Sequence, residues 1–124
     1  MYEVISIGFC PEDARLIIKT KDCASGVERY NNIVFFQVLA YGFDDIGRKN
    51  IIDEIADNPV LYFLNWYYSD RNPQKQFMLA YGLPLAFTDK TSAVKAADGK
   101  YIYYEINAYI GMDGFVIAQE MKME

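Results

Sequence analysis

Short segments in which hydrophobic and polar residues alternate recur along this chain, and alternation of this kind predicts β-strands. The first two such segments cover residues 4–9 and 14–20, with a turn at Pro11 between them. After a polar loop, residues 33–41 are hydrophobic on both faces, which predicts a central strand covered on both sides. An acidic turn over residues 42–48 ends this first group of predicted strands.

Two consecutive helical segments are predicted in the middle of the chain. Asn50 is placed to cap the first, because its side-chain oxygen can accept hydrogen bonds from a helix's first turn, and the hydrophobic residues of 50–56 then form one buried stripe. Asn58 and Pro59 interrupt this helix and begin the second, since proline is favoured at the first helical position. The aromatic residues of 60–68 favour a strand, but the cap favours a short helix, which we predict.

The last part of the chain carries the clearest turn signals. Residues 77–87 form a bent, strand-like run, and residues 91–97 are weakly patterned. Asp98-Gly99 and Asp113-Gly114 are dipeptides typical of two-residue hairpin turns, because such turns need positive φ at both central positions. The second dipeptide therefore predicts a terminal hairpin.

In this hairpin, residues 101–110 pair with residues 115–122. Met112 then faces Phe115, and Glu105 faces Lys122 as an attractive cross-strand pair. One face of the hairpin is apolar and holds Ile102, Tyr104, Ile106, Ala108, Ile110, Met112, Phe115, Ile117, Gln119 and Met121. The other face holds Tyr101, Tyr103, Glu105, Asn107, Tyr109, Val116, Ala118, Glu120 and Lys122.

These segments predict a single α+β domain over residues 1–124. Its core element is an antiparallel sheet of about five to six strands, and the short helical segment 50–68 packs on one face of it. A chain of 124 residues is long enough to bury a stable core without disulfide bonds or a bound metal.

The composition favours binding over catalysis. The chain has no histidine, the side chain that most often serves as general acid or base and as transition-metal ligand. It has eleven tyrosines, whose large apolar body and polar tip suit a recognition surface. Phosphate-binding glycine loops and calcium-ligand patterns are absent from the sequence. We therefore expect no enzyme activity, no cofactor, no metal and no catalytic residue.

The charge is negative and uneven. Seventeen acidic residues against twelve basic ones give a net charge of −5, which opposes binding of nucleic acid. Residues 43–58 and residues 98–124 each hold five acidic residues against two basic ones. Blocks of this kind steer basic partners toward a surface, although they are also compatible with ordinary solubility.

The two cysteines, Cys10 and Cys23, have no metal-binding spacing, and we expect both to be free thiols. The N-terminal residues lack the basic and apolar regions of a secretory signal. The longest apolar runs, 33–43 and 77–87, are shorter than the ~20 residues of a membrane helix. We therefore expect a cytoplasmic protein without a membrane-bound part.

Three segments carry a resemblance to a class of small, acidic bacterial proteins encoded near polymorphic toxins. They are IVFFQVLAYGF (33–43), NIIDEI (50–55) and YYEINAYIGMDGFVIA (103–118). The chain resembles these immunity-type proteins in its aromatic strand, the start of its predicted helix and its terminal hairpin. The resemblance implies a protein that binds and blocks a partner toxin. Proteins of this class share neither one fold nor one set of binding residues, so the resemblance assigns no site.

The expected function is a non-catalytic protein–protein interaction module, in the form of an immunity protein that neutralises a basic toxin. The predicted binding surface is the polar face of the terminal hairpin, with Tyr101, Tyr103, Glu105, Asn107, Tyr109 and Glu120. The alternative is a small-ligand binding protein with an apolar pocket, lined by aromatic residues of the sheet and of 66–68.

Overall fold

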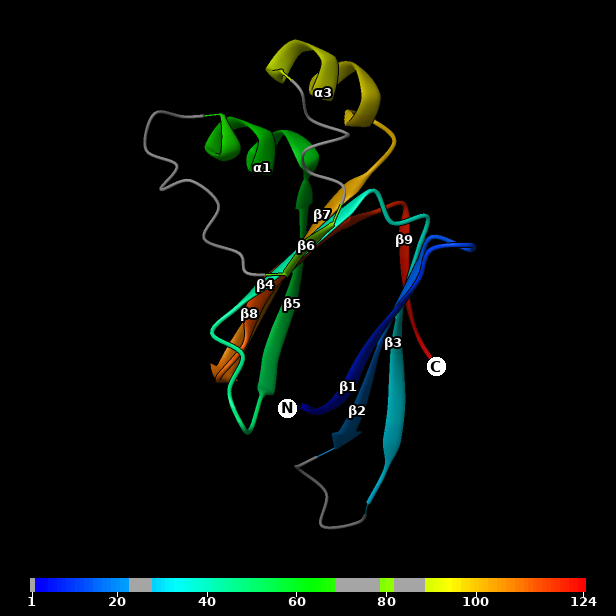
Figure 1. Cartoon of the computed structure of the whole chain (residues 1–124), viewed down its shortest axis with the longest axis vertical. Helices are drawn as coiled ribbons and strands as arrows, with labels where there is room; N and C mark the ends of the chain where they lie inside the picture. The colour runs from blue at the N-terminus through cyan, green and yellow to red at the C-terminus, as the bar shows by residue number, and fades with distance from the viewer. Residues whose placement is uncertain (1, 23–27, 69–78, 82–88) are drawn as a thin grey trace.

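The computed structural model of this chain describes residues 2–22, 28–68, 79–81 and 89–124. These ranges hold nine strands and two helices (Figure 1). In chain order the elements are β1 (Tyr2–Cys10), β2 (Arg15–Asp22), β3 (Tyr30–Phe36), β4 (Ala40–Asp44), β5 (Ile51–Pro59), α1 (Val60–Tyr67), β6 (Leu79–Tyr81), α3 (Lys90–Ala97), β7 (Ile102–Ile110), β8 (Asp113–Ala118) and β9 (Glu120–Met123).

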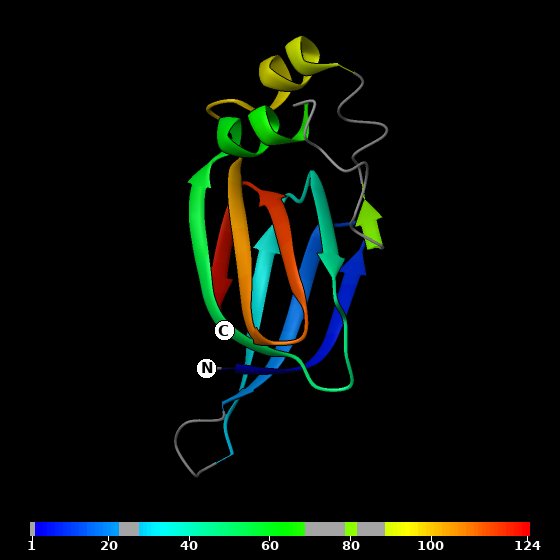
Figure 2. The same ribbon diagram turned by 90° about the vertical axis from the view of Figure 1, so that its left-hand side faces the viewer.

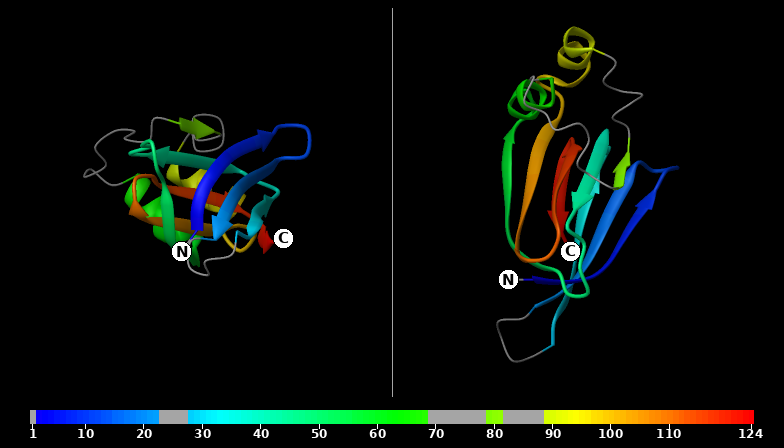
Figure 3. Two further views of the ribbon diagram at one scale, coloured as in Figure 1. Left: turned by 90° about the horizontal axis from the view of Figure 1, so that it is seen from below. Right: turned by 60° about the vertical axis from the view of Figure 1, so that its left-hand side comes forward.

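The nine strands form one antiparallel sheet in the order β6-β4-β8-β7-β5-β1-β2-β3-β9. The sheet folds back on itself, so that two halves face each other (Figures 2 and 3). Strands β6, β4, β8, β7 and β5 make up the helix-bearing half, and strands β1, β2, β3 and β9 make up the second half. The antiparallel sheet is thus confirmed, with more strands than the sequence predicts.

The two halves are joined at two places, and at the first of them β3 and β9 bend and continue as β4 and β8. β3 pairs with β9 up to Phe36 and Glu120, and the pairing resumes between β4 and β8 at Ala40 and Ile117. Gln37 lies in the bend with a positive φ of 53°, which a strand residue does not adopt. The predicted strand 33–41 is therefore divided into β3 and β4. The second junction consists of two residue pairs between β1 and β5.

Two hydrophobic cores result from this arrangement. The first lies between the halves and holds large buried side chains such as Phe35, Phe43 and Ile106. The second lies on the outer face of the helix-bearing half, where Phe63 and Leu64 of α1 pack with Phe115 and other residues of the sheet. Helix α3 contributes its buried alanines to this second core.

The predicted helix over residues 50–56 is wrong, because residues 51–56 lie in β5. β5 pairs with β7 along its length, from Ile51 with Ile110 to Pro59 with Ile102. The side chain of Asn50 does not cap a helix and instead binds backbone groups of Gly47 and Met112. Strand pairing over this length outweighs a local capping signal, since helix propensity is a weak preference that tertiary contacts override.

The predicted helix over residues 60–68 is confirmed as α1. Helix α3 covers the weakly patterned residues 91–97, and its N-terminus is capped by Asp89, whose carboxylate accepts a hydrogen bond of 2.8 Å from the backbone of Ser92. Asp98-Gly99 ends this helix and does not form a hairpin turn. Of the predicted run 77–87, only 79–81 lie within the described residues, and they form β6.

The terminal hairpin forms, but its predicted register is wrong. Ile106 pairs with Gly114 and Ile102 with Ala118, so Glu105 faces Phe115 instead of Lys122. This shift turns over the faces of β8. Val116 and Ala118, predicted on the polar face, belong to the core between the halves, whereas Phe115 and Ile117 lie on the outer face under the helices.

The faces of β7 agree with the prediction. Ile102, Tyr104 and Ile106 pack in the core between the two halves. Tyr103, Glu105, Asn107 and Tyr109 alternate onto the outer face of the helix-bearing half. Neither α1 nor α3, the two helices in the described part of the chain, is long and apolar enough to span a membrane.

Candidate interaction surface

The outer face of β7 carries four of the six residues predicted to bind a partner, Tyr101 directly precedes the strand, and the helices divide this face in two. Tyr101 and Tyr103 are half-buried in the core beneath α1 and α3. Further along the strand, Glu105 and Asn107 are half-buried, and Tyr109 is 64% exposed. The predicted surface is therefore covered at one end and accessible at the other.

Neighbouring strands add acidic side chains to the accessible end. Glu54 of β5 pairs with Asn107, and Asp44 of β4 pairs with Asp113 of β8 on the same outer face. Antiparallel pairing thus places the two acidic blocks of the sequence on adjacent strands. We call this surface the acidic face, and it comprises Asp44, Glu54, Glu105, Asn107, Tyr109 and Asp113.

The acids of this face are not neutralised by other described residues. The described part of the chain holds two ion pairs, Lys21 with Glu28 and Lys122 with Glu120, and neither involves the acidic face. Asp44 and Asp113 lie directly opposite each other, and like charges in this position are destabilising. The carboxylate of Asp113 accepts a hydrogen bond of 3.0 Å from the backbone N–H of Ala108, which holds it in place.

Glu120, the sixth predicted residue, does not belong to this surface. It lies in β9 on the second half of the sheet, opposite Phe36 of β3. Its carboxylate is 3.6 Å from the Lys122 ammonium group, which also lies over the Phe36 ring. The bend after β8 carries Glu120 away from the other five residues.

An exposed aromatic residue of α1 extends the surface and was not predicted. Val60, Phe63 and Leu64 turn toward the sheet, and Tyr62 lies on the outer side of the helix with 64% of its surface exposed. The Tyr62 ring lies 6.4 Å from the Tyr103 ring, with the two planes inclined by 21°. Helical periodicity within residues 60–67 distinguishes Tyr62 from its buried neighbours once the segment is known to be a helix.

Tyr103 links this aromatic pair to the acidic face. Its ring also contacts Phe63, with centroids 5.2 Å apart, and Phe115, with centroids 6.2 Å apart. Burial raises the pKa of the Tyr103 phenol well above its ordinary value, and the charge of Glu105 and the nearby Tyr62 raise it further. The phenol therefore stays protonated and neutral at physiological pH.

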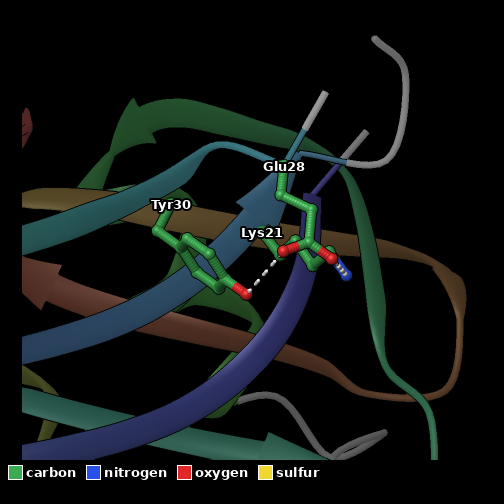
Figure 4. A network of polar contacts seen from close by, with 3 residues as sticks. All are labelled: Lys21, Glu28 and Tyr30. Carbon is green, nitrogen blue, oxygen red and sulfur yellow. Dashed lines mark hydrogen bonds and ion pairs between the residues drawn. The ribbon is translucent and has the colours of Figure 1, made fainter. Parts of the chain in front are cut away.

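A second exposed tyrosine–glutamate pair lies at the opposite end of the molecule. Tyr30 donates a long hydrogen bond of 3.5 Å to Glu28, and the ammonium group of Lys21 is 3.1 Å from the same carboxylate (Figure 4). The hydrogen bond to Glu28, and then its charge, raise the pKa of Lys21. This carboxylate already has a cation from its own chain, which distinguishes it from Glu105.

The described residues contain no group of three or more cysteine, aspartate or glutamate residues arranged to hold a metal ion. Cys10 is a half-buried free thiol whose sulfur is 3.8 Å from the Asp13 carboxylate. Cys23 and the side chains of Trp66 and Tyr67 lie outside the part of the chain for which the structure describes side chains.

No family model, no curated protein and no solved structure matches the chain.

Proposed function

We propose that this chain is a non-catalytic protein-binding module whose acidic face receives a basic partner protein. In its most specific form, the proposal is an immunity-type protein that neutralises a basic toxin in the bacterial cytoplasm. The observation that supports it is the gathering of Asp44, Glu54, Glu105 and Asp113 on one sheet face, without an ion pair among the described residues.

Electrostatics gives this surface a role in association. Uncompensated carboxylates on one face create a negative potential that accelerates the approach of a basic protein and selects against acidic ones. The exposed Tyr109 and Tyr62 supply contact area at low entropic cost, because a tyrosine side chain has few rotatable bonds. Charge for steering and aromatic residues for contact are the two components expected of a protein interface.

The alternative of a small-ligand pocket has less support. A pocket between the halves of the sheet would occupy the core in which twelve buried side chains pack, Phe35, Phe43 and Tyr104 among them. Rings in this core are in contact with one another, as those of Phe35 and Tyr104 are, with centroids 5.3 Å apart.

Co-expression with the product of the adjacent gene tests the proposal. We expect a complex that survives size-exclusion chromatography, whose association rate falls steeply as salt is raised. The double variant Glu54→Gln and Glu105→Gln should slow association, because it removes two negative charges from the acidic face. The matched variant Glu28→Gln should not, because Glu28 lies outside this face and is paired with Lys21. A complex indifferent to salt and to the double variant, or the absence of any complex, contradicts the proposal.

A further inference from the structure

Two places among the described residues combine an exposed tyrosine ring with a nearby glutamate, and they differ in one respect. At Tyr30 and Glu28 the carboxylate is already paired with Lys21. At Tyr62, Tyr103 and Glu105 no basic side chain of the described residues forms an ion pair with the carboxylate. The Lys21 ammonium group shows that a cation can pair with a glutamate beside a tyrosine ring. No such cation from the described residues is paired with Glu105.

The geometry at the second place favours a flat cation. The rings of Tyr62 and Tyr103 are nearly parallel, and Tyr62 leaves most of its surface to solvent. Glu105 lies two residues after Tyr103 on the same face of β7, and its cross-strand neighbours are Ala56 on β5 and Phe115 on β8. A group that enters here meets an aromatic ring and a carboxylate at once.

Arginine meets these requirements better than lysine. Its guanidinium group is planar, stacks on aromatic rings and pairs with a carboxylate through two parallel N–H groups. It is also less strongly hydrated than an ammonium group, so it loses less on leaving water. Cations positioned over tyrosine rings are stabilised by the negative charge of the ring face.

We propose that Tyr62, Tyr103 and Glu105 form a docking site for an arginine side chain of the basic partner. The site rests on the proposed function, and it specifies the group of the partner that the acidic face recognises. The guanidinium stacks on the exposed Tyr62 ring and pairs with the Glu105 carboxylate, while Tyr103 holds the Tyr62 ring in place from below.

A titration with hexa-arginine, followed by NMR, tests the site without the natural partner. The peptide should shift the resonances of Tyr62 and Glu105 more than those of Tyr30 and Glu28. Tyr62→Ala should weaken hexa-arginine binding by about two- to fivefold, the usual size of an exposed cation–π contact. Tyr62→Phe keeps the ring and should retain the affinity, whereas Glu105→Gln should weaken binding because it removes the charge.

The controls separate this site from general attraction between a basic peptide and an acidic protein. Tyr62→Ala leaves the net charge unchanged, and so does the matched variant Tyr30→Ala, which should have no effect. Hexa-lysine carries the same charge as hexa-arginine, and Tyr62→Ala should weaken its binding less than it weakens the binding of hexa-arginine. Equal effects of Tyr62→Ala and Tyr30→Ala, or equal sensitivity of the two peptides, would overturn the proposal.

Failure of the arginine site can be distinguished from failure of the proposed protein-binding function. A complex with the adjacent gene product that forms normally with the Tyr62→Ala variant overturns the arginine site and leaves the protein-binding function intact. Specific binding of hexa-arginine at Tyr62 without such a complex supports the arginine site and contradicts the assigned partner.

Discussion

The side-chain oxygen of Asn50 accepts a hydrogen bond of 3.0 Å from the backbone N–H of Met112, which is 62 positions away in the chain. The same oxygen accepts a second hydrogen bond from the N–H of Gly47, and the Asn50 amide donates one to the Gly47 carbonyl. One side chain thus fixes the connection between β4 and β5 to the turn between β7 and β8, next to the acidic face.

Replacing Asn50 should therefore destabilise the fold. Asn50→Ala leaves the partly buried N–H of Met112 without its partner, and we expect a loss of about 1–3 kcal/mol in the free energy of unfolding. Urea denaturation measures the loss. Asn65→Ala is the matched control, because Asn65 is exposed in α1 and alanine favours helices. A loss as small as that of the control would show that the Asn50 hydrogen bonds contribute little.

Gly114 should not tolerate any side chain. A Cβ atom at this position would collide with the Phe43 ring and would lie 2.7 Å from the carbonyl oxygen of Gly42. We expect Gly114→Ala to lower the free energy of unfolding by about 1–3 kcal/mol, as overpacking of a core does. Gly8→Ala places a Cβ atom in open space within β1 and should be neutral or slightly stabilising. Equal stability of the two variants would contradict this packing.

These two positions also show why the sequence predicts only part of the fold. The helix of residues 60–67 is predicted correctly, although Asn58 and Pro59, which were expected to begin it, lie at the end of β5. The faces of β7 are predicted because a buried face leaves an alternating pattern in the sequence. β5 is not predicted, since its helix-like start at Asn50 is overridden by hydrogen bonds to Gly47 and Met112.

The register of the terminal hairpin depends on contacts that no local pattern records. Gly114 of the predicted turn instead lies within β8, where its missing side chain admits the Phe43 ring of the neighbouring strand. Asp113 binds the backbone of Ala108, and Gly111 adopts the positive φ of 84° in the turn. The same limit applies to the candidate surface. Its β7 residues were predicted from alternation, whereas Tyr62, Glu54 and Asp44 join it through tertiary pairing.

The fold should lose stability at alkaline pH. Burial raises the pKa of Tyr103 and also that of Tyr104 above the ordinary value of 10.0. Above about pH 10 the unfolded chain therefore releases these phenolic protons while the folded protein keeps them, and the free energy of unfolding falls as pH rises. Below pH 10 both states are protonated, and these groups cause no pH dependence.

Urea denaturation between about pH 8 and about pH 11 tests this prediction, because this range begins below the ordinary tyrosine pKa and ends above it. Tyr103→Phe should lose less stability over this range than the unmodified protein, because phenylalanine has no proton to release. Tyr30→Phe, which removes an exposed phenol, is the matched control. An identical alkaline slope for Tyr103→Phe and the unmodified protein would show that the Tyr103 phenol titrates normally in the fold.

Two tyrosines on the same face of β7 should respond differently to truncation. Tyr103 packs against Phe63 and Phe115 beneath α1, so Tyr103→Ala should lower the free energy of unfolding by about 2–3 kcal/mol, somewhat less than for a fully buried aromatic residue. Tyr109 is 64% exposed, and Tyr109→Ala should leave stability unchanged within ~0.5 kcal/mol. Thermal or urea unfolding of both variants measures this contrast.

Tyr109 should matter directly for binding of the partner, although it matters little for stability, and the reverse should hold for Tyr103. In the complex with the basic partner, Tyr109→Ala should reduce affinity without any loss of stability, because it removes contact area from the accessible end of the acidic face. Reduced binding by Tyr103→Ala would follow from its effect on α1 and should be accompanied by a lower unfolding midpoint. If Tyr109→Ala binds as tightly as the unmodified protein, the accessible end of β7 is not the contact surface. If Tyr109→Ala instead destabilises the fold, the outer face of β7 supports the structure along its whole length.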